Sequence, residues 1–112
     1  MIDSYEFGEI VIDGKTYTSD VIIYPDRIDD GWRRKEGHKL SVEDIKGVLD
    51  SRPEVLVVGT GYSACLKVES GTKRALEESG VELIVADTTK ACREFNQLAG
   101  RKSVVAALHL TC

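Results

Sequence analysis

The chain has few of the residues that small proteins use for cross-links, cofactors or membrane insertion. Among its 112 residues are only three cysteines, none in a CxxC pair, which argues against a disulfide framework and against a zinc knuckle. No apolar run approaches the ~20 residues of a membrane span, and the N-terminus is acidic where a signal or transit peptide is basic. We therefore expect a single domain over residues 1–112 that is cytoplasmic and makes no membrane contact.

Positive charge is also scarce. Lys and Arg total 15 against 19 Asp and Glu, which gives a formal charge of -4. Nucleic acid is thus an unexpected partner, because its binding depends on Lys and Arg contacts to phosphates. His38 and His109 have no cysteine or carboxylate at the spacing of a metal site or catalytic triad, so we expect no metal, no cofactor and no catalytic residues.

What the sequence does contain is a short aliphatic run that ends in glycine. Val55–Val58 are four consecutive aliphatic residues, and Gly59, Thr60 and Gly61 follow. Three of the four are β-branched, which is typical of a strand. A strand that is apolar on both faces favours a parallel sheet covered on both sides.

The other elements follow from local patterns. Asp13-Gly14 lies between β-rich flanks and predicts a two-residue type I′ hairpin turn. The remaining patterns predict strands over 20–24, 81–86 and 103–110, and helices over 41–49, 70–79 and 88–99. The sequence therefore predicts an α/β fold, in which an N-terminal antiparallel β portion packs beside a βαβ-type core of parallel strands with about three helices.

The loops after two of these strands are the candidate ligand site. Ligands of parallel sheets gather at the carboxyl ends of the strands. The candidates lie in loop 59–63 and in segment 87–92, namely Gly59, Thr60, Gly61, Asp87, Thr88, Thr89 and Cys92. There the glycines and a helix N-terminus favour close approach of an anion. The alternative is that the glycines only form a tight turn and a threonine only caps the helix, since the GxGxxG and phosphate-loop patterns are absent.

Cys92 has two interpretations. Near the start of a helix its thiolate is favoured by the helix dipole, which is how reactive cysteines arise. It also shares the apolar stripe of that helix with Phe95, which favours a buried, inert thiol.

A basic cluster around the only tryptophan is a candidate interaction patch. Trp32, Arg33 and Arg34 lie in a polar segment with two glycines, which we interpret as a loop or a hairpin tip with an exposed tryptophan. Arginine binds phosphates and tryptophan stacks on bases, but the acidic balance favours a protein partner. The alternative is a solvated loop whose tryptophan packs over the edge of the sheet.

Several of these segments together resemble a known family. They are Gly59-Thr60-Gly61 after an aliphatic strand, Asp87-Thr88, Ala91-Cys92, Phe95-Asn96, Leu98, Arg101, Val104 and Ala106-Ala107-Leu108, with the upstream segment 31–38. The chain resembles the Mth-type domain proteins: archaeal and bacterial single-domain members, the adipogenesis-associated eukaryotic protein and the mitochondrial NADH dehydrogenase (complex I) assembly factor three. The resemblance implies a compact α/β domain and no known reaction, and its eukaryotic branch implies protein partners.

The functional hypothesis is a non-catalytic binding or assembly module. We expect its partners to be an unidentified protein and a second copy of the chain, because small domains with open sheet edges often pair. The alternative is a small-molecule or anion-binding protein, or an enzyme, that uses the glycine loop 59–63 and the helix N-terminus 87–92.

Overall fold

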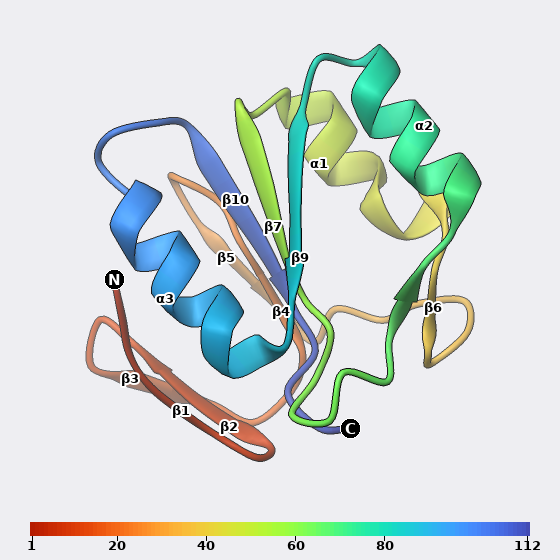
Figure 1. Cartoon of the computed structure of the whole chain (residues 1–112). Helices are drawn as coiled ribbons and strands as arrows, with labels where there is room; N and C mark the ends of the chain where they lie inside the picture. The colour runs from red at the N-terminus through yellow and green to blue at the C-terminus, as the bar shows by residue number, and fades with distance from the viewer.

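A five-stranded mixed sheet forms the centre of the computed structural model, which describes all of residues 1–112 (Figure 1). Its strands, in spatial order, are β5 (Ile28–Asp30), β4 (Val21–Ile23), β10 (Val104–Leu108), β7 (Val55–Gly59) and β9 (Glu82–Ala86). The strands β10, β7 and β9 run parallel to one another, whereas β4 and β5 run antiparallel to their neighbours. The predicted parallel core is therefore confirmed, with β7 between β10 and β9.

A separate antiparallel sheet is formed by the strands β1 (Ile2–Glu6), β2 (Glu9–Ile12) and β3 (Lys15–Tyr17). The turn between β2 and β3 is the predicted one: Asp13 and Gly14 have φ angles of 48° and 81°, the positive values that a type I′ turn requires. The strand β1 was not predicted, and it pairs with β2.

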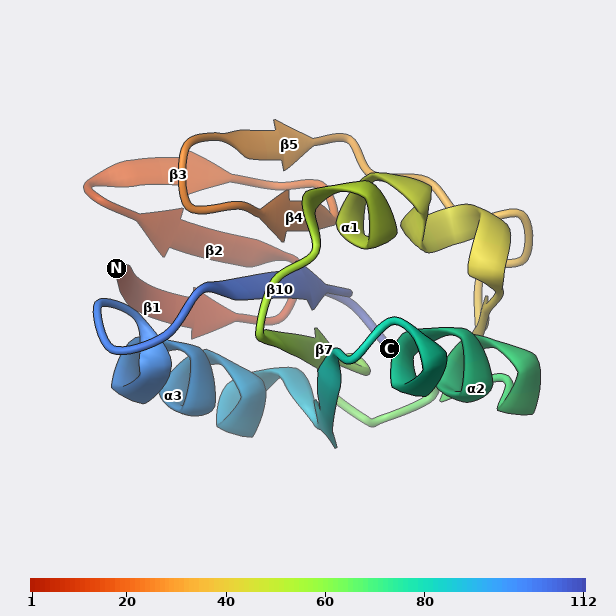
Figure 2. The ribbon, with the colours of Figure 1, turned by 90° about the horizontal axis from the view of Figure 1, so that it is seen from above.

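Helices and the small sheet cover the two faces of the central sheet (Figures 1 and 2). The helix α3 (Thr88–Leu98) and the three-stranded sheet lie on one face, and α1 (Lys46–Ser51) and α2 (Ser70–Glu78) lie on the other. The helix expected over 41–49 begins instead with a 3-10 turn at Val42–Ile45. The carboxylate of Asp44 stabilises that turn by accepting hydrogen bonds from the N–H and the hydroxyl of Ser41, both at 2.9 Å.

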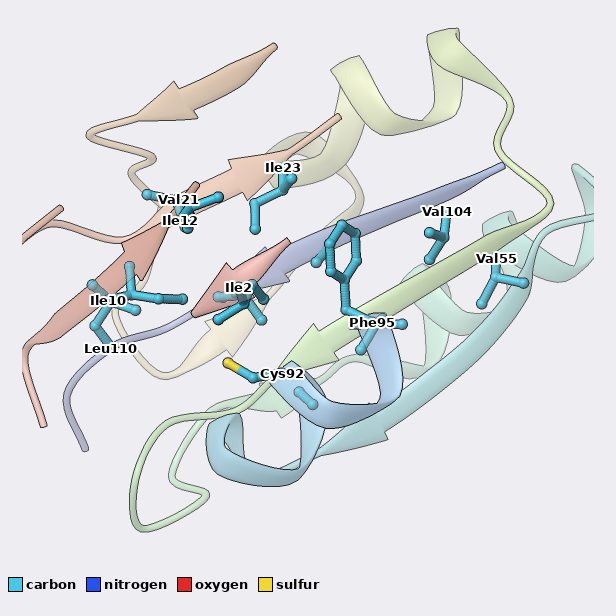
Figure 3. Packing of buried hydrophobic residues seen from close by; sticks show 14 residues of the cluster. Ile2, Ile10, Ile12, Val21, Ile23, Val55, Cys92, Phe95, Val104 and Leu110 are labelled. Atoms are coloured by element: carbon cyan, nitrogen blue, oxygen red, sulfur yellow. The ribbon is translucent and has the colours of Figure 1, made fainter. Parts of the chain in front are cut away.

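Two apolar cores result from the alternation of side chains along the central strands. Val55 and Val57 of β7 point into one core, which includes Phe95 and the residues shown in Figure 3. Leu56 and Val58 point into the other core, beneath α1 and α2. Every residue of β7 and β10 is buried, as expected for strands covered on both faces.

The small sheet is attached to α3 by an amide side chain. Asn96 accepts a hydrogen bond from the N–H of Ile2 at 2.9 Å and donates one to the carbonyl of Ile2 at 2.8 Å. Its amide thereby takes the place of a neighbouring strand for β1, which is a structural role.

Two features of the fold differ from the sequence-based prediction. The strand β4, expected in the N-terminal antiparallel portion, belongs to the central sheet with β5, a strand whose polar sequence indicates a loop. A short parallel pair, β6 (Lys39–Leu40) and β8 (Lys67–Val68), was also missed because two residues leave no periodicity to detect. None of the helices has the length and apolar character needed to cross a membrane.

Candidate functional site

The two predicted loops meet at the carboxyl edge of the parallel strands. The N–H of Thr60 donates to the carbonyl of Ala86 at 2.9 Å, and the N–H of Gly61 donates to Oγ1 of Thr88 at 2.8 Å. In return, the N–H of Thr88 donates to the carbonyl of Gly61 at 3.1 Å. The side chains of Thr60 and Thr88 are buried by these contacts. The predicted adjacency of the loops is therefore confirmed, and the hydroxyl of Thr88 is the point where they join.

The space beside the glycine loop is filled by the segment Leu110–Cys112 of the same chain. The N–H of Tyr62 donates to the carbonyl of Thr111 at 2.6 Å, and the N–H of Cys65 donates to the carbonyl of Cys112 at 3.0 Å. At Gly61, whose φ is 108°, a Cβ atom would collide with the backbone of Cys112. The absence of a side chain at Gly61 thus allows the backbone of Cys112, from the same chain, to approach closely. Whether loop 59–63 also binds a ligand stays a prediction.

The N-terminus of α3 is capped from within the chain. Oδ1 of Asp87 accepts a hydrogen bond from the N–H of Lys90 at 3.0 Å, so the carboxylate occupies the place where an anion would bind. Thr89 is exposed beside it. Cys92 lies one turn further along, with its side chain in the apolar core. Burial raises the pKa of the Cys92 thiol from 9.0 to about 12, which favours the inert thiol of the two interpretations.

A partly buried charged cluster lies beside this edge, and sequence reasoning missed it. Oδ2 of Asp20 accepts hydrogen bonds from Nη1 of Arg34 at 2.9 Å and from Nδ1 of His109 at 2.8 Å. Oδ1 of the same carboxylate accepts from the N–H of Leu110 at 2.8 Å. Burial works against ionisation of Asp20, but these hydrogen bonds, with that of His109 the largest, outweigh it and hold the pKa of the carboxyl below its ordinary value.

His109 has one ring nitrogen in use and one without a partner. Nδ1 lies 2.8 Å from the Asp20 carboxylate and 3.1 Å from Nη2 of Arg34. Since a carboxylate only accepts and a guanidinium only donates, the shorter contact assigns the Nδ1 proton to the bond with Asp20. Nε2 is buried and has no hydrogen-bond partner. No sequence signal pointed to this pair, because 89 residues separate its members.

The expected exposure of the tryptophan cluster is wrong for two of its three residues. Trp32 is only 8% exposed, and its Nε1–H donates to the carbonyl of Asp44 at 3.0 Å. The Arg34 side chain is 5% exposed, and its guanidinium stacks on the Trp32 ring at 4.7 Å. Only Arg33 is exposed. The interaction-patch role stays a prediction, now one that depends on Arg33 alone for surface contact.

An exposed aromatic pair at the same edge was also missed. Phe7, in the turn between β1 and β2, is 58% exposed, and Tyr62, in the glycine loop, is 59% exposed. Their rings pack edge to face, with centroids 6.1 Å apart and an interplanar angle of 78°. Residues that are 55 positions apart in the sequence thus form one exposed apolar feature.

Comparison with known proteins supports the resemblance noted above. Residues 2–109 match the model of a family described as "Protein of unknown function (DUF498/DUF598)". The chain is 27% identical over 108 residues to NADH dehydrogenase [ubiquinone] 1 alpha subcomplex assembly factor 3 of Xenopus tropicalis, and 30% identical over 109 residues to the protein of that name of Danio rerio.

These alignments include most of this chain and a smaller share of its relatives. They cover 95% and 96% of the chain, but 58% of the Xenopus protein and 62% of the Danio protein, so the chain spans about three fifths of their length. A crystal structure of a conserved hypothetical protein of Pyrococcus horikoshii OT3 superposes with a TM-score of 0.86 at 32% identity. That superposition covers 100% of this chain and 99% of the other.

Proposed function

Since the chain belongs to the DUF498/DUF598 family, with relatives named as assembly factors of NADH dehydrogenase, we propose that it is a non-catalytic module that binds another protein during assembly of a larger complex. The names of these relatives do not say which residues of this chain would bind a partner. The proposal therefore depends on a surface of this chain that suits a protein partner.

The observation that carries the proposal is the exposed pair of Phe7 and Tyr62. Aromatic side chains dominate the binding energy of protein interfaces because they bury a large area at a small entropic cost. The backbone beneath this pair is fixed: the N–H of Gly8 donates to the carbonyl of Leu110 at 2.8 Å, and the N–H of Tyr62 donates to the carbonyl of Thr111. Two exposed rings on a rigid edge are a suitable anchor for a partner protein.

The polar groups at this edge favour binding over a reaction. The hydroxyl of Thr88 donates to the carbonyl of His109 at 2.6 Å, and that of Thr60 donates to the carbonyl of Ala86 at 3.0 Å, so both are engaged in holding the edge together. Cys92 is buried in the core.

The alternative is that an anion or small molecule binds at 59–63 and 87–92. It predicts a thermal shift with nucleotides or phosphorylated metabolites. No shift in such a screen would count against this alternative.

We further propose that two copies associate through β9. This strand is at the edge of the central sheet, and its Val85 is 45% exposed, which leaves both backbone and apolar surface available for pairing. Sedimentation velocity should show a dimer at high concentration and a monomer for Val85→Lys. A monomer at all concentrations of the unaltered chain would discard this part of the proposal.

The location we propose is the cytoplasm, to be tested by fractionation of cells that express the chain.

The test of the partner-binding role is affinity capture from a native lysate with three forms of the chain. The unaltered chain should retain a protein that the double variant Phe7→Ser/Tyr62→Ser loses. Lys73→Ser/Glu77→Ser is the matched control, because it changes two exposed side chains of α2, which belong neither to the aromatic pair nor to β9, and should retain the same protein. Circular dichroism of all three forms checks that the fold is intact. Equal capture by the double variant would remove the aromatic pair from the proposal.

A further inference from the structure

A cavity of about 820 Å³ lies at the end of the molecule opposite to the carboxyl edge. It is bounded by the start of β10, the end of α3, the hairpin turn after β2 and the turn between β4 and β5. Small-molecule sites typically have volumes of about 300–1,000 Å³ and apolar walls with a few polar groups. Nine of its 18 lining residues are hydrophobic, so half of the lining is apolar.

The apolar wall comes from both sheets and from α3. It includes Ile12, Tyr17, Ile23, Ile28, Phe95 and Val104. Figure 3 shows the Phe95 ring, carried by α3, between the side chains of Ile23 and Val104. The strands β3 and β5 are each at the edge of their sheet, so no further strand closes the cavity between Tyr17 and Ile28. The apolar wall is therefore open to a ligand from that side.

The carboxylates on the rim of the cavity already have partners. Asp13 pairs with the amino group of Met1 at 2.6 Å, and Asp26 pairs with Arg27 at 3.3 Å. Oε2 of Glu54 accepts a hydrogen bond from the N–H of Ser103 at 2.7 Å. Asp13 and Asp26 are thus each matched by a positive charge, whereas Glu54 keeps its negative charge because its partner is a neutral amide.

Two consecutive cations on the rim have no such partner. Arg101 and Lys102 follow α3, and neither side chain takes part in any of the five ion pairs of the chain. Arg27 lies across the cavity, with its guanidinium stacked on the Tyr24 ring at 3.9 Å. After Glu54 is set against them, Arg101 and Lys102 leave one net positive charge at the rim of a half-apolar cavity, in a chain whose formal charge is -4. An anionic head group is the complement of that rim.

We propose that this cavity binds a small amphipathic carboxylate, with its alkyl chain entering between Tyr17 and Ile28, which are only partly buried, and its head group at Arg101 and Lys102. The site is distinct from the aromatic pair of the proposed function and does not depend on it. A free amphiphile suits the cavity better than a bilayer, because the apolar residues line a concave space and do not project from the surface.

Titrations with three ten-carbon probes below their micelle concentrations test the head group. Decanoate should bind and shift the amide signals of residues 99–104 in a heteronuclear NMR spectrum. Decanol and decyltrimethylammonium keep the chain and should bind about tenfold more weakly or not at all, since neither forms a charge-assisted hydrogen bond with the two cations. Equal binding of all three probes would overturn the charge argument. Binding to phosphatidylglycerol vesicles without binding of decanoate would overturn the choice of a free ligand.

Three variants test the location. The double variant Arg101→Gln/Lys102→Gln should weaken decanoate binding about tenfold, because the head group loses both cations, and Ala99→Phe should weaken it by placing a ring into the cavity. Lys90→Gln/Arg93→Gln is the matched control, because it removes two exposed cations of α3 that do not line the cavity, and it should bind as the unaltered chain does. Phe7→Ser/Tyr62→Ser should also bind decanoate normally, which separates this site from the proposed function. Unchanged affinity in Arg101→Gln/Lys102→Gln would overturn the proposal.

Discussion

Nδ1 of His109 and Oδ2 of Asp20 lie 2.8 Å apart and connect the end of β10 to the start of β4, the strand beside it. The same carboxylate also accepts from the N–H of Leu110, the first residue of the segment that fills the glycine loop. One partly buried acid therefore fixes the direction in which the chain leaves the central strand. The shape of the carboxyl edge, with its exposed aromatic pair, depends on this contact.

Asp20→Asn should destabilise the fold by about 3 kcal/mol. An amide cannot accept every hydrogen bond that the carboxylate accepts, and the Arg34 guanidinium, only 5% exposed, would be left without its counter-charge. Removing one partner of a buried pair costs about 3–5 kcal/mol, and the lower end applies here because Asp20 is 16% exposed. Urea unfolding followed by circular dichroism measures the change. Asp26→Asn, which breaks an exposed pair with Arg27, should change stability by less than about 0.5 kcal/mol.

The stability difference between the unaltered chain and Asp20→Asn should depend on pH in the acid range. The pKa of Asp20 is lower in the folded chain than the ordinary value of 3.8. Its contribution is therefore fully present above pH 3.8 and is lost as the pH falls through the lower, folded-state pKa. Urea midpoints measured from pH 7 to pH 2 should differ by a constant amount until about pH 4 and then converge. A difference that stays constant down to pH 2 would show that the carboxylate charge contributes nothing.

Local patterns in the sequence were enough to predict the parallel core. The aliphatic run at Val55–Val58, the turn at Asp13-Gly14 and the amphipathic period of α3 each depend on neighbouring residues, and each was found where expected. The fold class and the meeting of the two loops followed from them, because parallel strands end at a common edge.

The features that were missed depend on contacts between distant residues. Trp32 and Arg34 lie among polar residues, so their local pattern indicates exposure. In the fold, Asp20 and His109, which flank two strands of the central sheet, bind Arg34. Trp32 packs into the core beneath α1 and α2. The membership of β4 in the central sheet depends on pairing with β10, more than 80 residues away. Such a long-range pairing leaves no periodic pattern in the local sequence from which it could be predicted.

Cys92 should resist thiol reagents that modify Cys65 and Cys112. The latter two are exposed, whereas Cys92 is buried and the pKa of its thiol is raised to about 12. Mass spectrometry after a short exposure to a disulfide reagent at pH 8 should find two labels in the native chain and three after unfolding. Rapid labelling of Cys92 in the native chain would instead favour the reactive thiol of the alternative hypothesis.

The raised pKa of the Cys92 thiol also predicts a loss of stability in alkali. A thiol with a higher pKa in the folded chain contributes stability that is present below its unfolded value of 9.0 and is lost as the pH rises toward about 12. Cys92→Ala removes this dependence. The stability of the unaltered chain should therefore fall more steeply than that of the variant between pH 9 and about pH 12. Parallel curves for the two chains would contradict the shift.

Gly61→Ala should destabilise the fold by about 2 kcal/mol or more, the cost of placing a side chain at a strained backbone position. At a φ of 108° a side chain is strained, and its Cβ would collide with the backbone of Cys112. Gly37→Ala is the control, because nothing lies within 4 Å of its Cβ position, and it should be nearly neutral. Urea unfolding measures both variants.

Hydrogen exchange gives a second measurement on Gly61→Ala. The amides of Tyr62 and Ser63 donate to the carbonyls of Thr111 and Cys112, so displacement of that segment by the added methyl group should speed their exchange. If the stability and the exchange rates were both unchanged, the segment would not require a glycine at this position. The glycine would then need another explanation, and close approach of a ligand to loop 59–63 would become the better one.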